Sequence, residues 1–90
     1  MKSEEAKFLQ AFGRRIAAGR KELGLTQAEL AEKVGIAPTY IASIETGRRW
    51  PHLTIIHEIA NALGTTPYGL VSDAEEEAVP GVKTVAPLTI

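Results

Sequence analysis

Four short stretches of helical sequence, each closed by a glycine, constrain the fold of this 90-residue chain most strongly. Within each stretch, apolar residues recur three or four positions apart, the spacing that places them on one face of an α-helix. A glycine at the end of such a stretch is a common helix stop. The glycines are Gly24, Gly35, Gly47 and Gly64. The chain is therefore expected to be all-α, built from short helices around one core.

The first expected helix runs from about residue 4 to residue 23, with Phe8, Phe12 and Ile16 on its apolar stripe. Gly13 and Gly19 lie inside this stretch. They weigh against an unbroken helix, because a glycine in a helix costs about 1 kcal/mol relative to alanine.

The next two helices meet across a short turn. Thr26 and Glu29 match the Thr-x-x-Glu capping box, in which each side chain accepts the other residue's backbone N–H. Pro38 suits the first position of the following helix, over about 38–46. Two short helices around a Gly35 turn are typical of a helix-turn-helix, here about 26–46, whose second helix enters the DNA major groove.

The last two expected helices complete a domain over residues 1–71. One spans about 53–63, and a short one begins at Thr66-Pro67 and is anchored by Leu70 and Val71. Residues 72–90 open acidic and continue with β-branched residues and two prolines, which predicts an extended tail. Such a tail is either flexible or an extended arm that packs on a partner subunit or forms a strand.

Composition excludes several classes of protein. No apolar run approaches the ~20 residues of a membrane span, and no signal core follows the N-terminus, so a cytoplasmic protein without membrane contact is expected. The chain has no cysteine, which excludes disulfides, thiolate metal sites and a cysteine nucleophile. His52 and His57 share no helix face, so neither a metal site nor another cofactor is expected. No arrangement of catalytic residues indicates an enzyme.

Charge is unevenly distributed along the chain. The formal net charge of −1 argues weakly against nucleic-acid binding. However, residues 1–71 hold nine Lys/Arg and seven Asp/Glu, a net +2, whereas residues 72–90 hold one Lys and four acids, a net −3. The expected helical domain is therefore mildly basic, and the acidity belongs to the expected tail.

A set of short motifs occurs in a fixed order. The motifs are Phe12-Gly-x-x-Ile16, Arg20, Gly24-Leu-Thr-Gln-x-x-Leu-Ala31, Val34-Gly-Ile36, Ile41-x-x-Ile-Glu-x-Gly47, Pro51, Ile59-Ala-x-Ala-Leu-Gly64 and Leu70. Through them residues 12–71 resemble the lambda-repressor-like (Cro/CI, XRE-type) helix-turn-helix family. Thr39-Tyr-Ile-x-x-Ile-Glu45 is also similar to the controller proteins of restriction–modification systems. The resemblance implies a five-helix domain that binds operator DNA, usually as a dimer.

The resemblance also implies roles for individual residues. Gln27 would bind a DNA phosphate and brace the recognition helix. The residues that would face the groove or the DNA backbone are Pro38, Thr39, Tyr40, Ser43, Arg48 and Arg49. At Pro38 the family often has a polar residue, which weakens base reading there. Arg14 and Arg15 are weaker candidates for DNA contact.

Arg20 and Glu45 align with a family pair that forms an internal ion pair between the first and third helices. Arg20 lies on the apolar stripe of the first helix, which independently indicates a buried side chain. Phe8 and Trp50 are expected to pack, with a dimer surface as an alternative for Trp50.

These features favour a sequence-specific transcription regulator, a repressor, that binds a pseudo-palindromic operator as a homodimer through the major groove. The alternative is an antitoxin-like or coactivator-like protein-interaction module of the same fold, with a protein partner bound through residues 72–90.

Overall fold

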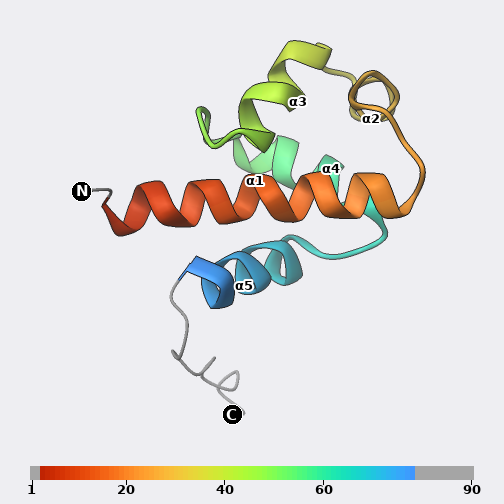
Figure 1. Ribbon diagram of the computed structural model, residues 1–90. Helices are drawn as coiled ribbons and strands as arrows, with labels where there is room; N and C mark the ends of the chain where they lie inside the picture. Colours follow the sequence, from red (N-terminus) through yellow and green to blue (C-terminus); the bar gives the residue numbers. More distant parts are fainter. Residues whose placement is uncertain (1–2, 79–90) are drawn as a thin grey trace.

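The computed structural model describes residues 3–78, and within them the chain forms five α-helices and no strand. The helices are α1 (Glu4–Glu22), α2 (Gln27–Val34), α3 (Pro38–Glu45), α4 (Leu53–Leu63) and α5 (Pro67–Ala78). Helix α1 runs through the middle, with α2 and α3 on one side of it and α5 on the other (Figure 1). The expected all-α, lambda-repressor-like fold is confirmed.

All five helices contribute to one core. Its fully or nearly fully buried apolar residues are Ala11, Phe12, Ile16, Leu30, Ala31, Ile41, Ile44, Ile56, Ile59, Ala60, Leu70 and Ala74. Apart from Ala11 and Ala74, they lie on the inward helix faces that the apolar spacing predicts. Within residues 3–78, no helix is both long and apolar enough to cross a membrane.

Helix α1 is continuous through Gly13 and Gly19, so the helix expected over about residues 4–23 is confirmed despite its two glycines. Ser3 caps the helix by accepting the Ala6 N–H at 3.1 Å. Gly13 is buried where α3 ends against α1, and a Cβ there would overlap the backbone carbonyl oxygens of Ile44 and Glu45. The cost of a glycine within the helix is thus offset by the close approach of α3 that it permits.

The helix-turn-helix forms through local bonds that the sequence predicts. The Thr26 N–H donates to Glu29 Oε1 at 2.9 Å and the Glu29 N–H donates to Thr26 Oγ1 at 3.0 Å, which completes the capping box. The hydrogen bond from the Thr26 backbone favours the charged carboxylate and is the main cause of the lowered pKa of Glu29. Gly35 ends α2 at φ 84°, a left-handed conformation that glycine adopts without strain.

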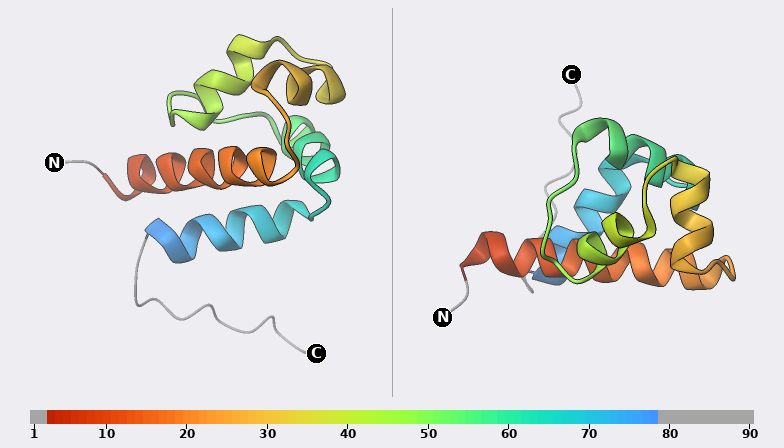
Figure 2. Two further views of the ribbon diagram at one scale, coloured as in Figure 1. Left: turned by 45° about the vertical axis from the view of Figure 1, so that its right-hand side comes forward. Right: turned by 90° about the horizontal axis from the view of Figure 1, so that it is seen from above.

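Helix α5 is longer than predicted, and residues 72–78 are helical rather than extended. Leu70 and Ala74 are buried one turn apart, on a face that packs along α1 (Figure 2). The acidic residues between 73 and 77 made the helical spacing of Leu70 and Ala74 difficult to recognise in the sequence. A domain boundary at residue 71 is therefore wrong for these seven residues, and the remainder of the expected tail, 79–90, lies outside the described residues.

Candidate nucleic-acid interface

Helix α3 is anchored by one face and presents the other outward. Ile41 and Ile44 are fully buried in the core, whereas Pro38 and Thr39 are exposed at the start of the helix. Tyr40 and Ser43 are half-buried. Since α3 lies at the outside of the molecule, next to α2, its first turn is open to a ligand (Figure 1).

The hydroxyl of Ser43 is bonded within its own helix. Its Oγ–H donates to the Tyr40 carbonyl oxygen at 2.8 Å. A serine hydroxyl has one donor and two acceptor positions, so Ser43 in this rotamer offers an acceptor to a base edge and not a donor. Thr46, directly after α3, donates in the same way to the Ala42 carbonyl oxygen at 2.9 Å.

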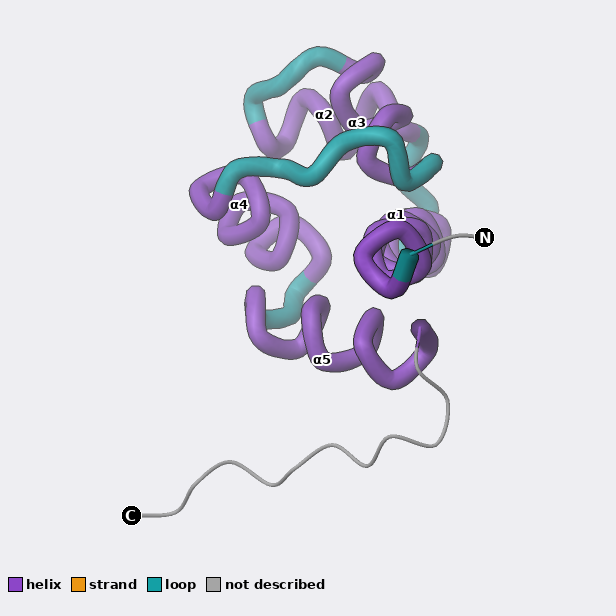
Figure 3. The backbone as a smooth tube through the Cα atoms, turned by 90° about the vertical axis from the view of Figure 1, so that its left-hand side faces the viewer, coloured by secondary structure: helices purple, strands orange, loops and turns teal. Residues whose placement is uncertain are grey.

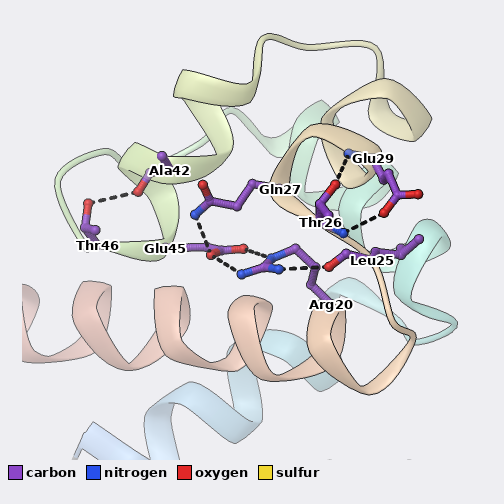
Figure 4. A network of polar contacts seen from close by, with 8 residues as sticks. All are labelled: Arg20, Leu25, Thr26, Gln27, Glu29, Ala42, Glu45 and Thr46. Carbon is purple, nitrogen blue, oxygen red and sulfur yellow. Dashed lines mark hydrogen bonds and ion pairs between the residues drawn. The ribbon is translucent and has the colours of Figure 1, made fainter.

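A polar network fixes the C-terminal end of α3 (Figure 4). Arg20 Nε and Nη2 donate to Oε2 and Oε1 of Glu45 at 2.7 and 3.0 Å. Arg20 Nη1 also donates to the Leu25 carbonyl oxygen at 2.8 Å. The side chains of Arg20 and Glu45 are only 11% and 5% exposed. The hydrogen bond with Glu45 raises the pKa of Arg20 above its ordinary value, against an opposing effect of burial.

Gln27 joins this network from the first position of α2. Its Nε2 donates to Glu45 Oε1 at 3.0 Å, so Glu45 connects α3 to both α1 and α2. The amide group keeps a second N–H and its carbonyl oxygen for other partners. Gln27 is half-buried. Its bond to Glu45 braces α3, and its second N–H could donate a hydrogen bond to a phosphate oxygen.

Arg48 and Arg49 are exposed in the segment that follows α3. The Arg49 guanidinium carbon lies 4.8 Å from the centre of the Tyr40 ring, which is a cation–π arrangement. The sequence did not predict this contact. The two residues are nine positions apart and in different elements, so no helical or strand spacing points to it.

Arg14 and Arg15 bind α5 and do not lie with the candidate DNA-contact residues of α3. Arg14 Nε binds Glu77 Oε1 at 2.6 Å, and Arg15 Nε lies 3.4 Å from Glu77 Oε2. Glu77 belongs to α5, which lies on the opposite side of α1 from α3 (Figure 2). These arginines therefore help to hold the end of α5 on α1.

Three aromatic residues, Phe8, Phe12 and Trp50, pack together. The Trp50 ring centre lies 5.6 Å from that of Phe8 and 5.0 Å from that of Phe12. Trp50 nevertheless remains 49% exposed. The loop between α3 and α4 is thus fastened to α1 by an aromatic ring whose outer side stays open to solvent.

Comparison with known proteins agrees with this geometry. The family model described as "Helix-turn-helix" matches residues 16–70. An uncharacterised helix-turn-helix-type transcriptional regulator of Methanothermobacter thermautotrophicus is 58% identical over 45 residues, which are 50% of this chain and 65% of that protein. The immunity repressor protein of Bacillus phage phi105 is 43% identical over 61 residues, 68% of this chain and 42% of the phage protein.

Among solved structures, the restriction–modification controller protein C.AhdI from Aeromonas hydrophila is similar, with a TM-score of 0.67 and 35% identity. The match covers 69% of this chain and 94% of the controller. The chain thus spans only part of the two relatives above but nearly all of this structural neighbour. Because the family model covers more than half of the sequence and the five helices follow the same plan, the chain belongs to the helix-turn-helix (XRE-type) family of DNA-binding proteins.

Proposed function

We propose that this protein is a sequence-specific transcription repressor that binds a pseudo-palindromic operator as a homodimer, with α3 in the major groove. One observation carries the proposal. The inner face of α3 is locked by Ile41, Ile44 and the bonds of Glu45, while its first turn is exposed. A helix that is held rigidly and has an exposed first turn is suited to contacting base edges.

Base reading is proposed for the first turns of α3. The hydroxyl of Thr39 can donate or accept at a base edge, and its methyl group can contact a thymine methyl. Pro38 has no donor and contributes only apolar contact. Tyr40 and Ser43 lie deeper. The Tyr40 ring would contact sugar or methyl groups next to Thr39, and the Ser43 oxygen would accept a hydrogen bond from a base-edge donor.

Phosphate binding is proposed for residues at both ends of the helix pair. Gln27 has its second amide N–H at the start of α2, where backbone N–H groups also favour an anion. Arg48 and Arg49 are cations beyond the end of α3. Contacts of this kind supply affinity and orientation but carry little sequence information.

The proposal is tested by selecting genomic fragments with the purified full-length protein, followed by footprinting. We expect one enriched motif with two half-sites centred about 34–36 Å apart, one turn of DNA. Binding should weaken as salt is raised, since phosphate contacts release counterions. Fragments without any shared sequence would refute specific recognition. Absence of DNA binding even at low salt would favour the protein-interaction module.

A further inference from the structure

A hollow beside the first turns of α1 takes no part in the proposed DNA contacts. It has a volume of about 360 Å³ and is lined by Glu5, Phe8, Leu9 and Trp50. Glu5, Phe8 and Leu9 are spaced i, i+3 and i+4, so they share one face of α1. Trp50 forms the other wall, with its ring centre 5.6 Å from that of Phe8. We call this site the Trp50 hollow.

The Trp50 hollow is apolar apart from one carboxylate. Among the described residues 3–78 that line it, Glu5 is the only one with a charge. The volume of the hollow lies within the range of about 300–1,000 Å³ that is typical of ligand pockets. A matching occupant is therefore apolar along most of its length and carries a cation where it passes Glu5.

Residues 79–90 of this chain have the matching pattern. Their larger apolar side chains recur at every third position. These are Val79, Val82, Val85 and Leu88. A polyproline II helix has three residues per turn, so this spacing places them along one edge. Pro80 and Pro87 favour that conformation. Lys83 is the only charged side chain in the segment, and it comes directly after the second valine of the row.

The direction of α5 leads the chain toward the Trp50 hollow. Leu70, near the start of α5, lines the same small hollow as Gly19 of α1. Glu77, near its end, binds Arg14. Helix α5 therefore runs antiparallel to α1, toward the first turns of α1 (Figure 2). Figure 3 shows the end of α5 on one side of α1 and the loop that carries Trp50 on the other, so the chain after α5 only has to pass these first turns.

The segment is long enough for this path. Glu5 lies nine residues before Arg14, which is about 14 Å along the axis of a helix that rises 1.5 Å per residue and is about 10–12 Å across. The combined offset is about 18 Å. Lys83 follows Glu77 by six residues, and a polyproline II chain spans about 19 Å over that number. Lys83 can thus reach Glu5 from the end of α5.

We propose that residues 79–90 bind the Trp50 hollow of their own chain as a polyproline II segment. Val82 and Val85 pack on the ring of Trp50. Lys83, between them in sequence, lies beside Glu5. Aromatic grooves bind such segments well because the polyproline II conformation is ordered beforehand, which lowers the entropic cost of binding. The bound segment fastens the loop after α3 to α1, and the proposal does not depend on DNA binding.

Trp50 is the only tryptophan of the chain, so its fluorescence reports on the segment that covers it. The test measures acrylamide quenching in the full-length protein. Val85→Asn removes a side chain from the apolar row and should weaken docking by roughly tenfold, which raises quenching. Thr84→Asn, a neighbour outside the row, should leave quenching unchanged. Both positions lie outside the described residues, and circular dichroism verifies that the helices are kept. Equal quenching in the wild type and both variants would overturn the proposal.

Charge reversal tests the contact between Lys83 and Glu5. Lys83→Glu and Glu5→Lys should each raise the quenching of Trp50, since an exposed ion pair shifts such an equilibrium by up to about fivefold. The double variant should restore the wild-type value. Glu4→Lys is the matched control, because Glu4 is exposed in the same turn of α1 but does not line the hollow. A double variant that is quenched as strongly as the single variants would contradict the proposed position of Lys83.

A spin label distinguishes docking on the same chain from docking on another copy. The chain has no cysteine, so Thr84→Cys places a single nitroxide on the segment. We expect this label to quench Trp50, whereas the same label at Glu32→Cys in α2 should not. The labelled Thr84→Cys/Trp50→Phe variant is then mixed with unlabelled wild type, and no quenching is expected. Quenching in that mixture would place the segment on another copy and overturn the proposal.

Discussion

Replacing Arg20 by alanine tests how the recognition helix is held. The substitution removes two hydrogen bonds from Glu45 and one from the Leu25 carbonyl oxygen. Glu45 would keep only its bond from Gln27, and its side chain is 5% exposed. A carboxylate left nearly buried without its cation is costly, because water cannot replace the lost partner.

The expected loss of stability is large for a domain of this size. Breaking a buried ion pair from one side costs about 3–5 kcal/mol. A domain of 60–100 residues loses about 4–8 °C of Tm for each kcal/mol, so Arg20→Ala should lower the Tm by roughly 12–40 °C. Domains are stable by only about 5–15 kcal/mol, so a loss of about 3–5 kcal/mol removes a large part of that stability.

Thermal and urea unfolding followed by circular dichroism measure this effect. Arg14→Ala is the matched control on the same helix, since its ion pair with Glu77 is exposed and such pairs contribute about 0–1 kcal/mol. The double variant Arg20→Met/Glu45→Met should recover part of the loss, because no buried charge remains unpaired. An Arg20→Ala variant that unfolds like the wild type yet no longer binds DNA would refute the structural role and make Arg20 a DNA contact.

Three further predictions concern the fold. Gly13→Ala should destabilise the domain by about 1–3 kcal/mol, because the new Cβ meets backbone atoms of α3. Gly19→Ala should be nearly neutral, because its Cβ meets the flexible Leu63 side chain at 3.3 Å. Equal urea midpoints for the two variants would contradict this difference. Glu29 has a lowered pKa in the folded state, so its contribution is present above its ordinary pKa of 4.5 and is lost as the pH falls through the lower folded value. Glu29→Gln should therefore flatten the fall of Tm below pH 4.5, and an identical acid profile would exclude the capping role. A chain ending at Val71 should have a much lower Tm than one ending at Ala78, which keeps all of α5; equal Tm values would show that the second half of α5 is dispensable.

Local sequence chemistry was sufficient to predict most of the fold. The capping box, the helix-ending glycines and the apolar spacing are properties of neighbouring residues, and the helices they predict are present. The end of α5 was missed because its acidic residues mask a small buried face at Ala74. Helix propensity alone also could not show that Gly13 is needed, since the reason lies in the backbone of another helix.

The candidate site was predictable to a similar extent. The bonds between Arg20 and Glu45 join residues 25 positions apart, and the position of Arg20 on an apolar stripe was the one local signal of its burial. The stacking of Arg49 on Tyr40 and the clustering of Trp50 with Leu53 and Tyr68 depend on how loops and helix ends meet in space. Sequence spacing carries no signal for contacts of this kind.

The most direct test of base reading by α3 is a comparison of Thr39→Ala with Arg48→Ala on the selected operator and on all its single-base variants. Thr39→Ala should lose about 1 kcal/mol of discrimination at one base pair in each half-site, because a base-edge contact is removed. Arg48→Ala should weaken binding to all sequences alike and lower the salt slope by about 1 for each copy bound. Unchanged base preferences at every position in Thr39→Ala would contradict the assignment of the exposed first turn of α3 as the reading surface.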